Sequence, residues 1–228
     1  MTKEEALALL PDLVNPLTED QARMVADHLT VRSYKKNELI YAEGETPSHL
    51  FCVIGGKVKI YKDGVGGRSQ IVRVINAVEY FGYRASFSGT PFITAAAAFE
   101  PCVIACIPLS IIKHLITQNG EFAWFFVQNL SVALGRADER LVSLTQKHIR
   151  GRLAESILFM KERYGVEEDG CTLDIRLSRE DMASLSNMTT SNAIRTLSLF
   201  AQENLIAIDG RKIMIINEEE LRRISRMG

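Results

Sequence analysis

The chain has 228 residues, of which 46% are hydrophobic and 24% are charged, and its formal net charge at pH 7 is −1. These values are ordinary for a globular protein of one large or two modest domains, and a charge so near zero excludes a polybasic, non-specific binder of nucleic acid. Four cysteines without a scaffold spacing, and an N-terminus (MTKEEALALL) that lacks the apolar core of a signal peptide, predict a cytoplasmic protein.

The first half of the chain changes from a helical to a strand pattern. Residues 1–32 have the apolar spacing of helices, whereas residues 33–108 read as short strands separated by glycine turns. Many short strands of this kind are typical of a β jelly roll or barrel. Val58 and Ile60, and with them Phe51 and Val53, alternate with polar or small residues, which predicts half-buried strands.

One stretch, from Phe92 to Ile112, is apolar enough to invite comparison with a membrane span. It is interrupted by Glu100, Pro101 and Pro108, so no run approaches the roughly 20 apolar residues of a spanning helix. The stretch therefore predicts two buried strands with a turn at Glu100-Pro101, and we expect no membrane partner.

A long helix is predicted from Gly120 to Lys147. Within it, apolar residues recur at alternating spacings of three and four, which is the a/d pattern of a coiled coil over three heptads. A seam this narrow favours pairing with a second helix, although a helix lying on its own domain's core gives a similar stripe. The predicted dimerisation residues are Val127, Leu130, Leu134, Ala137, Leu141 and Leu144, and His148 comes next in the series.

A junction follows the long helix. Gly151, between Arg150 and Arg152, predicts a hinge, because glycine within a helical pattern costs about 1 kcal/mol. A helix over 153–164 and a short strand over 172–177 are expected after it.

Residues 177–217 predict a helix, a tight turn, a second helix and a two-stranded hairpin, which is the order of a winged helix-turn-helix. Ser178 can cap the first helix, with Asp181 in the position of the capping-box acid. Asn187 falls in the turn, where a residue that tolerates positive φ is needed. Thr189 or Thr190 can cap the second helix.

The second helix and the hairpin have their own local signals. Ala193, Ile194, Leu197 and Phe200 are expected to hold the second helix against the body of the domain. The hairpin has the turn dipeptide Asp209-Gly210, which favours type I′ geometry.

Charge placement favours DNA as the partner of this segment. The helix from Thr189 to Gln202 carries one arginine and no acid, so nothing on it repels phosphate. The whole region 149–228 nevertheless has 12 Lys/Arg and 13 Asp/Glu. The alternative interpretation is a ligand-binding or docking module whose winged helix contacts protein.

A jelly roll with glycine turns, a long dimer helix and a C-terminal winged helix, in that order, resemble the Crp/Fnr family of bacterial transcription regulators. The segments that carry the resemblance are YAEGETPSHLFCVIGGKVKIYKDG, YFG followed by SGTP, IRGRLAESIL and LSREDMASLSNMTTSNAIRTLSLFAQENLI. They imply an α+β chain with a sensor jelly roll over 1–119, a dimerisation helix over 120–148 and a winged helix-turn-helix over 149–228. No catalytic constellation is recognisable, so we expect no enzyme.

The resemblance also implies partners and DNA-reading residues. A homodimer would bind double-stranded DNA at a near-palindromic operator, with RNA polymerase as a further partner. Arg195 remains where the family has its second base-reading arginine and can bond guanine O6 and N7; the alternative is a salt bridge to an acid. The other base-reading positions differ, so the operator should differ from that of the cyclic AMP receptor protein. The predicted DNA-binding residues are Arg179, Thr189, Thr190, Ser191, Asn192, Arg195, Gly210 and Arg211.

The sensor half departs from the family members that bind cyclic AMP. Those members usually have Gly-Glu, and then an arginine that neutralises the buried phosphate; this chain has Gly82-Tyr83-Arg84, and then Ile93-Thr94. The dimer-helix positions that usually give Thr-Ser to the adenine read Ala137-Asp138. We therefore expect no cyclic AMP in the familiar mode. The candidate effector-pocket residues are Gly82, Tyr83, Arg84, Ile93, Thr94, Ala137 and Asp138.

Other sensor chemistries have weaker support, and no cofactor or metal site is predicted. The first cysteine is Cys52, too late for the N-terminal cysteine set of an iron–sulfur member. Cys102 and Cys106 share one face of a predicted strand and could form a redox or metal pair, although buried small hydrophobes are favoured. Haem bound through one of four histidines stays open as an alternative. These histidines are His28, His49, His114 and His148.

Overall fold

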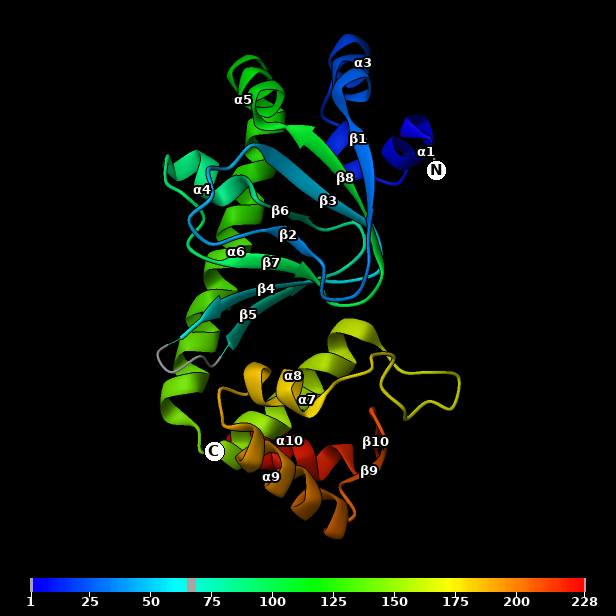
Figure 1. Ribbon diagram of the computed structural model, residues 1–228, viewed down its shortest axis with the longest axis vertical. Helices are drawn as coiled ribbons and strands as arrows, with labels where there is room; N and C mark the ends of the chain where they lie inside the picture. The colour runs from blue at the N-terminus through cyan, green and yellow to red at the C-terminus, as the bar shows by residue number, and fades with distance from the viewer. Residues whose placement is uncertain (1, 65–68, 228) are drawn as a thin grey trace. The chain divides into compact units, whose positions relative to one another are not determined.

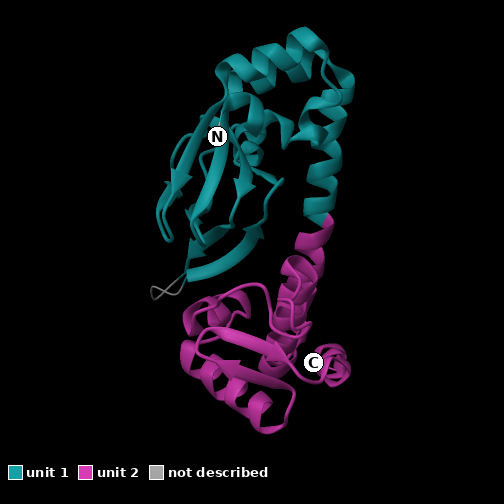
Figure 2. Ribbon diagram, turned by 90° about the vertical axis from the view of Figure 1, so that its right-hand side faces the viewer, with its two compact units in different colours: residues 1–134 teal, residues 135–228 magenta. Residues whose placement is uncertain are grey.

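The structure is a computed structural model, and it describes residues 2–64 and 69–227. The chain forms two compact units, Met1–Leu134 and Gly135–Gly228 (Figure 2). The long helix α6 (Gly120–Gln146) begins in the first unit and ends in the second. Its bounds confirm the predicted helix to within one residue.

Three short helices open the first unit: α1 (Lys3–Ala8), α2 (Pro11–Val14) and α3 (Glu19–His28). The helical expectation for residues 1–32 is wrong at its end, because β1 (Thr30–Tyr34) already pairs with β8 (Cys102–Pro108) there. Pairing with a distant strand overrides the local spacing.

Two four-stranded antiparallel sheets form the body of the first unit (Figure 1), which confirms the predicted β domain. One sheet has the order β1-β8-β3-β6, with β3 at His49–Gly55 and β6 at Tyr80–Phe81. The other has the order β2-β7-β4-β5. Its strands are β2 (Leu39–Tyr41), β4 (Val58–Asp63), β5 (Ser69–Ile75) and β7 (Ala95–Ala98). Strands β7 and β8 confirm the two strands and the Glu100-Pro101 turn predicted from the sequence.

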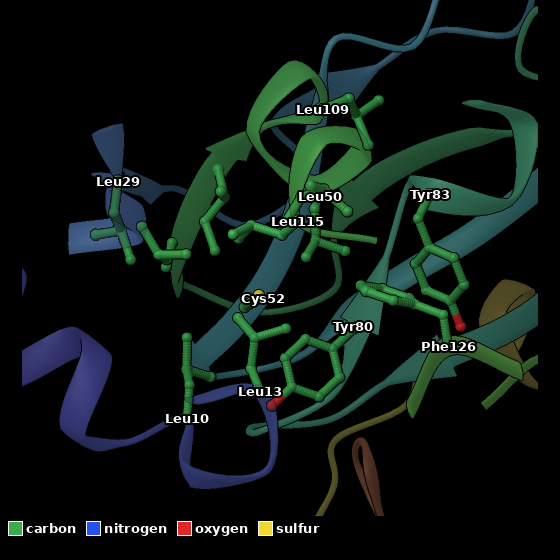
Figure 3. Close-up of a cluster of buried hydrophobic side chains, with 14 of the residues drawn as sticks. Leu10, Leu13, Leu29, Leu50, Cys52, Tyr80, Tyr83, Leu109, Leu115 and Phe126 are labelled. Carbon is green, nitrogen blue, oxygen red and sulfur yellow. The ribbon is translucent and has the colours of Figure 1, made fainter. Parts of the chain in front are cut away.

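Two neighbouring strands of the first sheet, β3 and β8, are buried on both faces. Phe51 and Val53 belong to a cluster that includes residues of both sheets, whereas Leu50 and Cys52 point into a second cluster with residues of the helices (Figure 3). Strand β3 is therefore buried at every position from Leu50 to Ile54, and the expectation that it is half-buried is wrong. The helices α1, α2, α3, α5 (Leu109–Gln118) and α6 supply the covering side chains.

A short helix, α4 (Tyr83–Ser88), follows β6 and was not predicted. It is bounded by Gly82 at φ +88° and Gly89 at φ +70°. A Cβ at Gly82 would lie 2.6 Å from the Phe51 ring, so both the backbone angle and the contact require glycine there. The rings of Tyr83 and Phe87 in α4 both pack edge-on against the ring of Phe126 in α6, and they are tilted against each other. These contacts fix the helix on the core.

Val78 is the one β-branched side chain at positive φ (+64°) in the described segments. Its N–H donates to Val53 O at 2.7 Å, and Val53 N–H donates to Glu79 O at 3.0 Å, so the pairing with β3 enforces the angle. This conformation costs an L-residue roughly 1–2 kcal/mol.

We expect Val78→Asn to raise the free energy of unfolding by about 1 kcal/mol, because asparagine tolerates this conformation. Urea denaturation checks the gain. Val78→Thr keeps the branched Cβ and should bring no comparable gain. If Val78→Asn and Val78→Thr gave the same free energy of unfolding, relief of backbone strain would not be the operative effect.

The second unit contains α7 (Ile149–Tyr164), α8 (Arg179–Leu185), α9 (Thr190–Gln202), β9 (Ile206–Asp209), β10 (Lys212–Ile215) and α10 (Glu218–Met227). Gly151 is buried within α7, so the predicted hinge is misplaced. The break falls at Lys147-His148, and His148 is the N-cap of α7, not a member of the α6 seam.

Two further expectations differ from the structure in this unit. Residues 172–177 form isolated bridges, Leu173 with Val166 and Thr172 with Met214, in place of the expected strand, because their backbone groups bond to several different segments. Helix α10 was not predicted from the sequence, although Asn217 Oδ1 accepts from Glu220 N–H at 3.0 Å as an N-cap does. Within the described segments, no helix is both long and apolar enough to cross a membrane.

Candidate DNA interface

Local contacts between residues a few positions apart build the helix-turn-helix. Ser178 Oγ accepts from Asp181 N–H at 3.0 Å, and Asp181 Oδ2 accepts from Ser178 N–H at 3.2 Å, which confirms the capping box at the start of α8. Asn187 has φ +49°, as the turn requires. Thr189 caps α9, its Oγ1 accepting from Asn192 N–H at 3.2 Å. These caps fix where each helix begins.

One side of α9 is buried and the other is open. The buried side consists of Ala193, Thr196, Leu197 and Phe200. Ile194, expected to face the body, is 46% exposed instead. Successive helical residues are about 100° apart, so the buried stripe is centred on Ala193 and Phe200, with Thr196 and Leu197 on its two sides, and Ile194 lies about 100° from Ala193. The open side carries Ser191, Ile194, Arg195, Ser198 and Leu199.

Arg195 is exposed, and Asn192 is its hydrogen-bond partner. Its Nη2 donates to Asn192 Oδ1 at 2.8 Å. No carboxylate pairs with Arg195 in the parts of the chain that the structure describes, so the salt-bridge alternative has no support there. The contact holds the guanidinium beside Asn192 in the N-terminal half of α9, on the same side of the helix as the exposed Ser191 one turn earlier. The predicted base-reading residues therefore lie together on two turns of one helix.

The wing is attached to the start of α8. Arg179 Nη2 donates to Gly210 O at 3.1 Å, which brings two of the predicted phosphate-contacting residues together. Asp209 pairs with Lys212, so the two loop residues are Gly210 and Arg211. Gly210 has φ +56°, whereas Arg211 has a negative φ. Positive φ at the first position alone is the pattern of a type II′ turn, and the expected type I′ geometry at Asp209-Gly210 is wrong.

Two arginines outside the predicted DNA-binding set hold the helix-turn-helix within its unit. Arg140, near the end of α6, donates from Nη2 to Leu185 O at 2.9 Å, and burial lowers its pKa. Arg150 of α7 makes a two-pronged ion pair with Glu203 (2.7 and 2.5 Å) and lies 5.0 Å from the Phe200 ring centroid. The last turns of α6 are thereby joined directly to α8.

A cavity of about 90 Å³ in the first unit gathers the five predicted effector-pocket residues of that unit, Gly82, Tyr83, Arg84, Ile93 and Thr94. Ala137 and Asp138 are exposed on α6 in the second unit. The remaining lining includes residues that the sequence gave no signal for, because the sheets bring them in from distant positions: Tyr41, Arg73 and Phe92.

The cavity has an aromatic wall and positive charge. Tyr41 stacks on Phe92 with ring centroids 3.7 Å apart. Burial raises the pKa of Tyr41 to about 12, while the nearby charges of Arg73 and Arg84 act in the opposite direction. The two guanidinium groups are thus close enough to influence the charge of a group at the cavity. Neither belongs to residue 93, the position where the cyclic AMP-binding members are expected to have their arginine.

Leu134 and Leu141 of the predicted dimer seam are 64% and 62% exposed, and Val127 is also exposed. Leu130 is different, because it packs against the core of its own unit and lines the cavity. Ala137 is exposed and Leu144 half-buried, and the large side chains of Trp124 and Val142 are exposed on the same helix.

No grouping of three or more His, Cys, Asp or Glu side chains suited to a metal ion occurs among the described residues. Cys102 and Cys106 both lie in the core between the sheets, on the shared face expected from their spacing. Burial raises the pKa of each thiol to about 11, so both are protonated at neutral pH and poorly suited to ligate a metal or attack a disulfide.

Comparison with known proteins identifies both halves of the chain. A family model described as a cyclic nucleotide-binding domain matches residues 31–119, and one described as a Crp-like helix-turn-helix domain matches residues 151–224. Together with the fold, these matches define the class as DNA-binding transcription regulators, which are not enzymes. Within that class, the chain belongs to the Crp/Fnr family.

Individual relatives resemble the chain over most of its length. The CRP-like cAMP-activated global transcriptional regulator of Mycobacterium tuberculosis is 24% identical over 194 residues, which cover 85% of this chain and 87% of that protein. FixK2 of Bradyrhizobium japonicum is 25% identical, with a TM-score of 0.77 over 86% of this chain and 96% of that one. A putative crp/fnr regulator from Eubacterium rectale shares the fold, with a TM-score of 0.79, 19% identity and coverage of 94% and 97%.

Proposed function

We propose that the protein is a homodimeric, sequence-specific transcription regulator that reads DNA with the open side of α9 and acts in the cytoplasm. The chemistry of this side carries the proposal. Arg195 has no acidic partner among the described residues, hydroxyl side chains lie around it, and there is no carboxylate from Thr189 to Gln202. Such a face approaches phosphate without repulsion and offers donors to base edges. RNA polymerase is the further partner that family membership suggests.

The exposed seam of α6 supports the homodimer. Leu134 and Leu141 are one heptad apart and mostly exposed, and large apolar side chains in a row on a soluble surface mark an interaction site. A second copy of α6 would cover them. Two-fold symmetry then predicts a near-palindromic operator with half-sites about 34 Å apart.

The contact of Arg140 with Leu185 suggests how the seam is coupled to the DNA-reading helix. Any change in the pairing of α6 would be passed to the end of α8, and through the turn to α9, by this partly buried hydrogen bond. An effector would act only by binding one arrangement of the dimer more tightly than another.

We propose that this effector is not cyclic AMP bound as in the familiar family members. Ile93 and Thr94 stand where the phosphate-neutralising arginine is expected, and a cavity of about 90 Å³ is small beside the 300–1,000 Å³ of ordinary ligand sites. The M. tuberculosis relative is named as cAMP-activated, but its pocket residues are not implied for this chain at 24% identity.

Selection from a random library of duplex DNA with the purified, ligand-free protein tests the function. We expect enrichment of a palindrome, bound with an affinity that falls steeply as salt rises, because phosphate contacts release counterions. Absence of any enriched sequence, with and without added cyclic nucleotides or haem, would reject DNA reading and favour a protein partner for the winged helix.

A further inference from the structure

We infer that Ile194 reads the 5-methyl group of a thymine in each operator half-site, next to the base that Arg195 contacts. This inference rests on the proposed function and adds a specificity-determining residue to it. The starting observation is an exposed isoleucine in the N-terminal half of α9, beside the polar Ser191 and Arg195: 46% of its surface is open, and it lies outside the buried stripe of the helix.

The position of Ile194 on the helix places it in the reading surface. Residues are about 100° apart around a helix, so Ile194 and Arg195 stand on either side of the line through Ser191 and Ser198. Ile194 is the fifth residue of α9, within the N-terminal half that enters the major groove in helix-turn-helix proteins.

The polar groups beside Ile194 are partly occupied by hydrogen bonds within the helix, and the side chain of Ile194 itself is exposed. Ser198 Oγ donates to Ile194 O at 3.0 Å, and Asn192 Oδ1 accepts from Arg195. The branched side chain of Ile194 has no hydrogen-bonding group, so its only favourable contact with a base edge is apolar. In the major groove, the thymine methyl is the apolar group that distinguishes one base from the others.

The test replaces thymine by deoxyuridine, which differs only by the missing methyl, at each thymine of the selected operator in turn. At one symmetric pair of positions, the uracil substitution should weaken wild-type binding by about 4-fold when made in one half-site and by about 15-fold when made in both. These factors are those expected for one buried methyl-sized group per half-site. For Ile194→Ala, binding to the thymine operator should fall similarly, and the uracil substitution at that pair should have no further effect. This non-additivity is the signature of direct contact.

Leu199→Ala is the matched control. Leu199 is also on α9 and 40% exposed, but it is about 140° from Ile194 around the helix, so its variant should keep the wild-type sensitivity to uracil. Circular dichroism confirms that both variants fold.

Three results would overturn the inference. If no thymine position is sensitive to uracil, or if Ile194→Ala keeps the sensitivity, Ile194 does not read a methyl group while the DNA-binding function stands. If no duplex is selected by the wild-type protein, the proposed function fails and the inference fails with it.

Discussion

Replacing Leu134 and Leu141 together by glutamate is expected to convert the protein from a dimer to a monomer. The two side chains are 64% and 62% exposed on one stripe of α6, and a coiled-coil partner would bury both. The variant would bring four carboxylates, together with Asp138, into that interface without partners, which is strongly unfavourable. Because simultaneous use of two half-sites multiplies affinity by roughly 10²–10⁴, operator binding should fall by a similar factor.

Light scattering after gel filtration gives the mass, and titration of the operator gives the affinity. Val132→Glu is the control, because Val132 is exposed on the same helix but about 200° from Leu134, and this variant should remain a dimer. Glutamate is a good helix former, so α6 should persist in both variants, which circular dichroism can verify. A monomeric wild-type protein, or a double variant that keeps the wild-type mass, would contradict the assigned interface.

The sequence was most informative where the determining contacts are local. The caps at Ser178 and Thr189 and the turn at Asn187 each depend on residues within four positions of one another. The sequence predicts the first cap and the turn correctly and narrows the second cap to Thr189 or Thr190. The hinge was misplaced because Gly151 was weighed for its intrinsic cost, whereas burial within α7 outweighs a penalty of about 1 kcal/mol.

Features that depend on distant residues escaped prediction. Strand β1 begins at Thr30 because it pairs with β8, more than 70 residues away, and β3 is buried on both faces because helices cover the sheet. Helix α4 depends on Gly82, whose lack of a side chain matters only because Phe51 lies against it.

The candidate site was predictable as a segment but not in its full composition. The residues of α9 were found, but apolar spacing alone could not decide whether Ile194 belongs to the buried stripe beside Ala193 or to the open side. Arg140 gave no signal, since its partner is a backbone carbonyl 45 positions later. Tyr41 and Arg73 reach the cavity through the sheet arrangement, which no local pattern encodes.

Arg195→Ala is expected to remove most of the sequence preference of the protein. A two-pronged contact of arginine with guanine is worth about 1–3 kcal/mol of discrimination, so each half-site should lose about 5- to 150-fold in affinity for its preferred base. Because the dimer uses two half-sites, the specific operator should approach the affinity of unrelated DNA. Parallel titrations of the operator and of a scrambled duplex measure the difference between the two.

Arg195→Lys separates base reading from simple charge. Lysine keeps the positive charge but lacks the planar fork, so this variant should retain the salt dependence of binding while losing discrimination at the guanine position. The opposite pattern would identify a different role: if Arg195→Ala weakened operator and scrambled DNA equally and lowered the salt slope by about one per half-site, Arg195 would be a phosphate contact. The hydrogen bond to Asn192 favours base reading, because it holds the guanidinium along the N-terminal half of α9, where the groove edges lie.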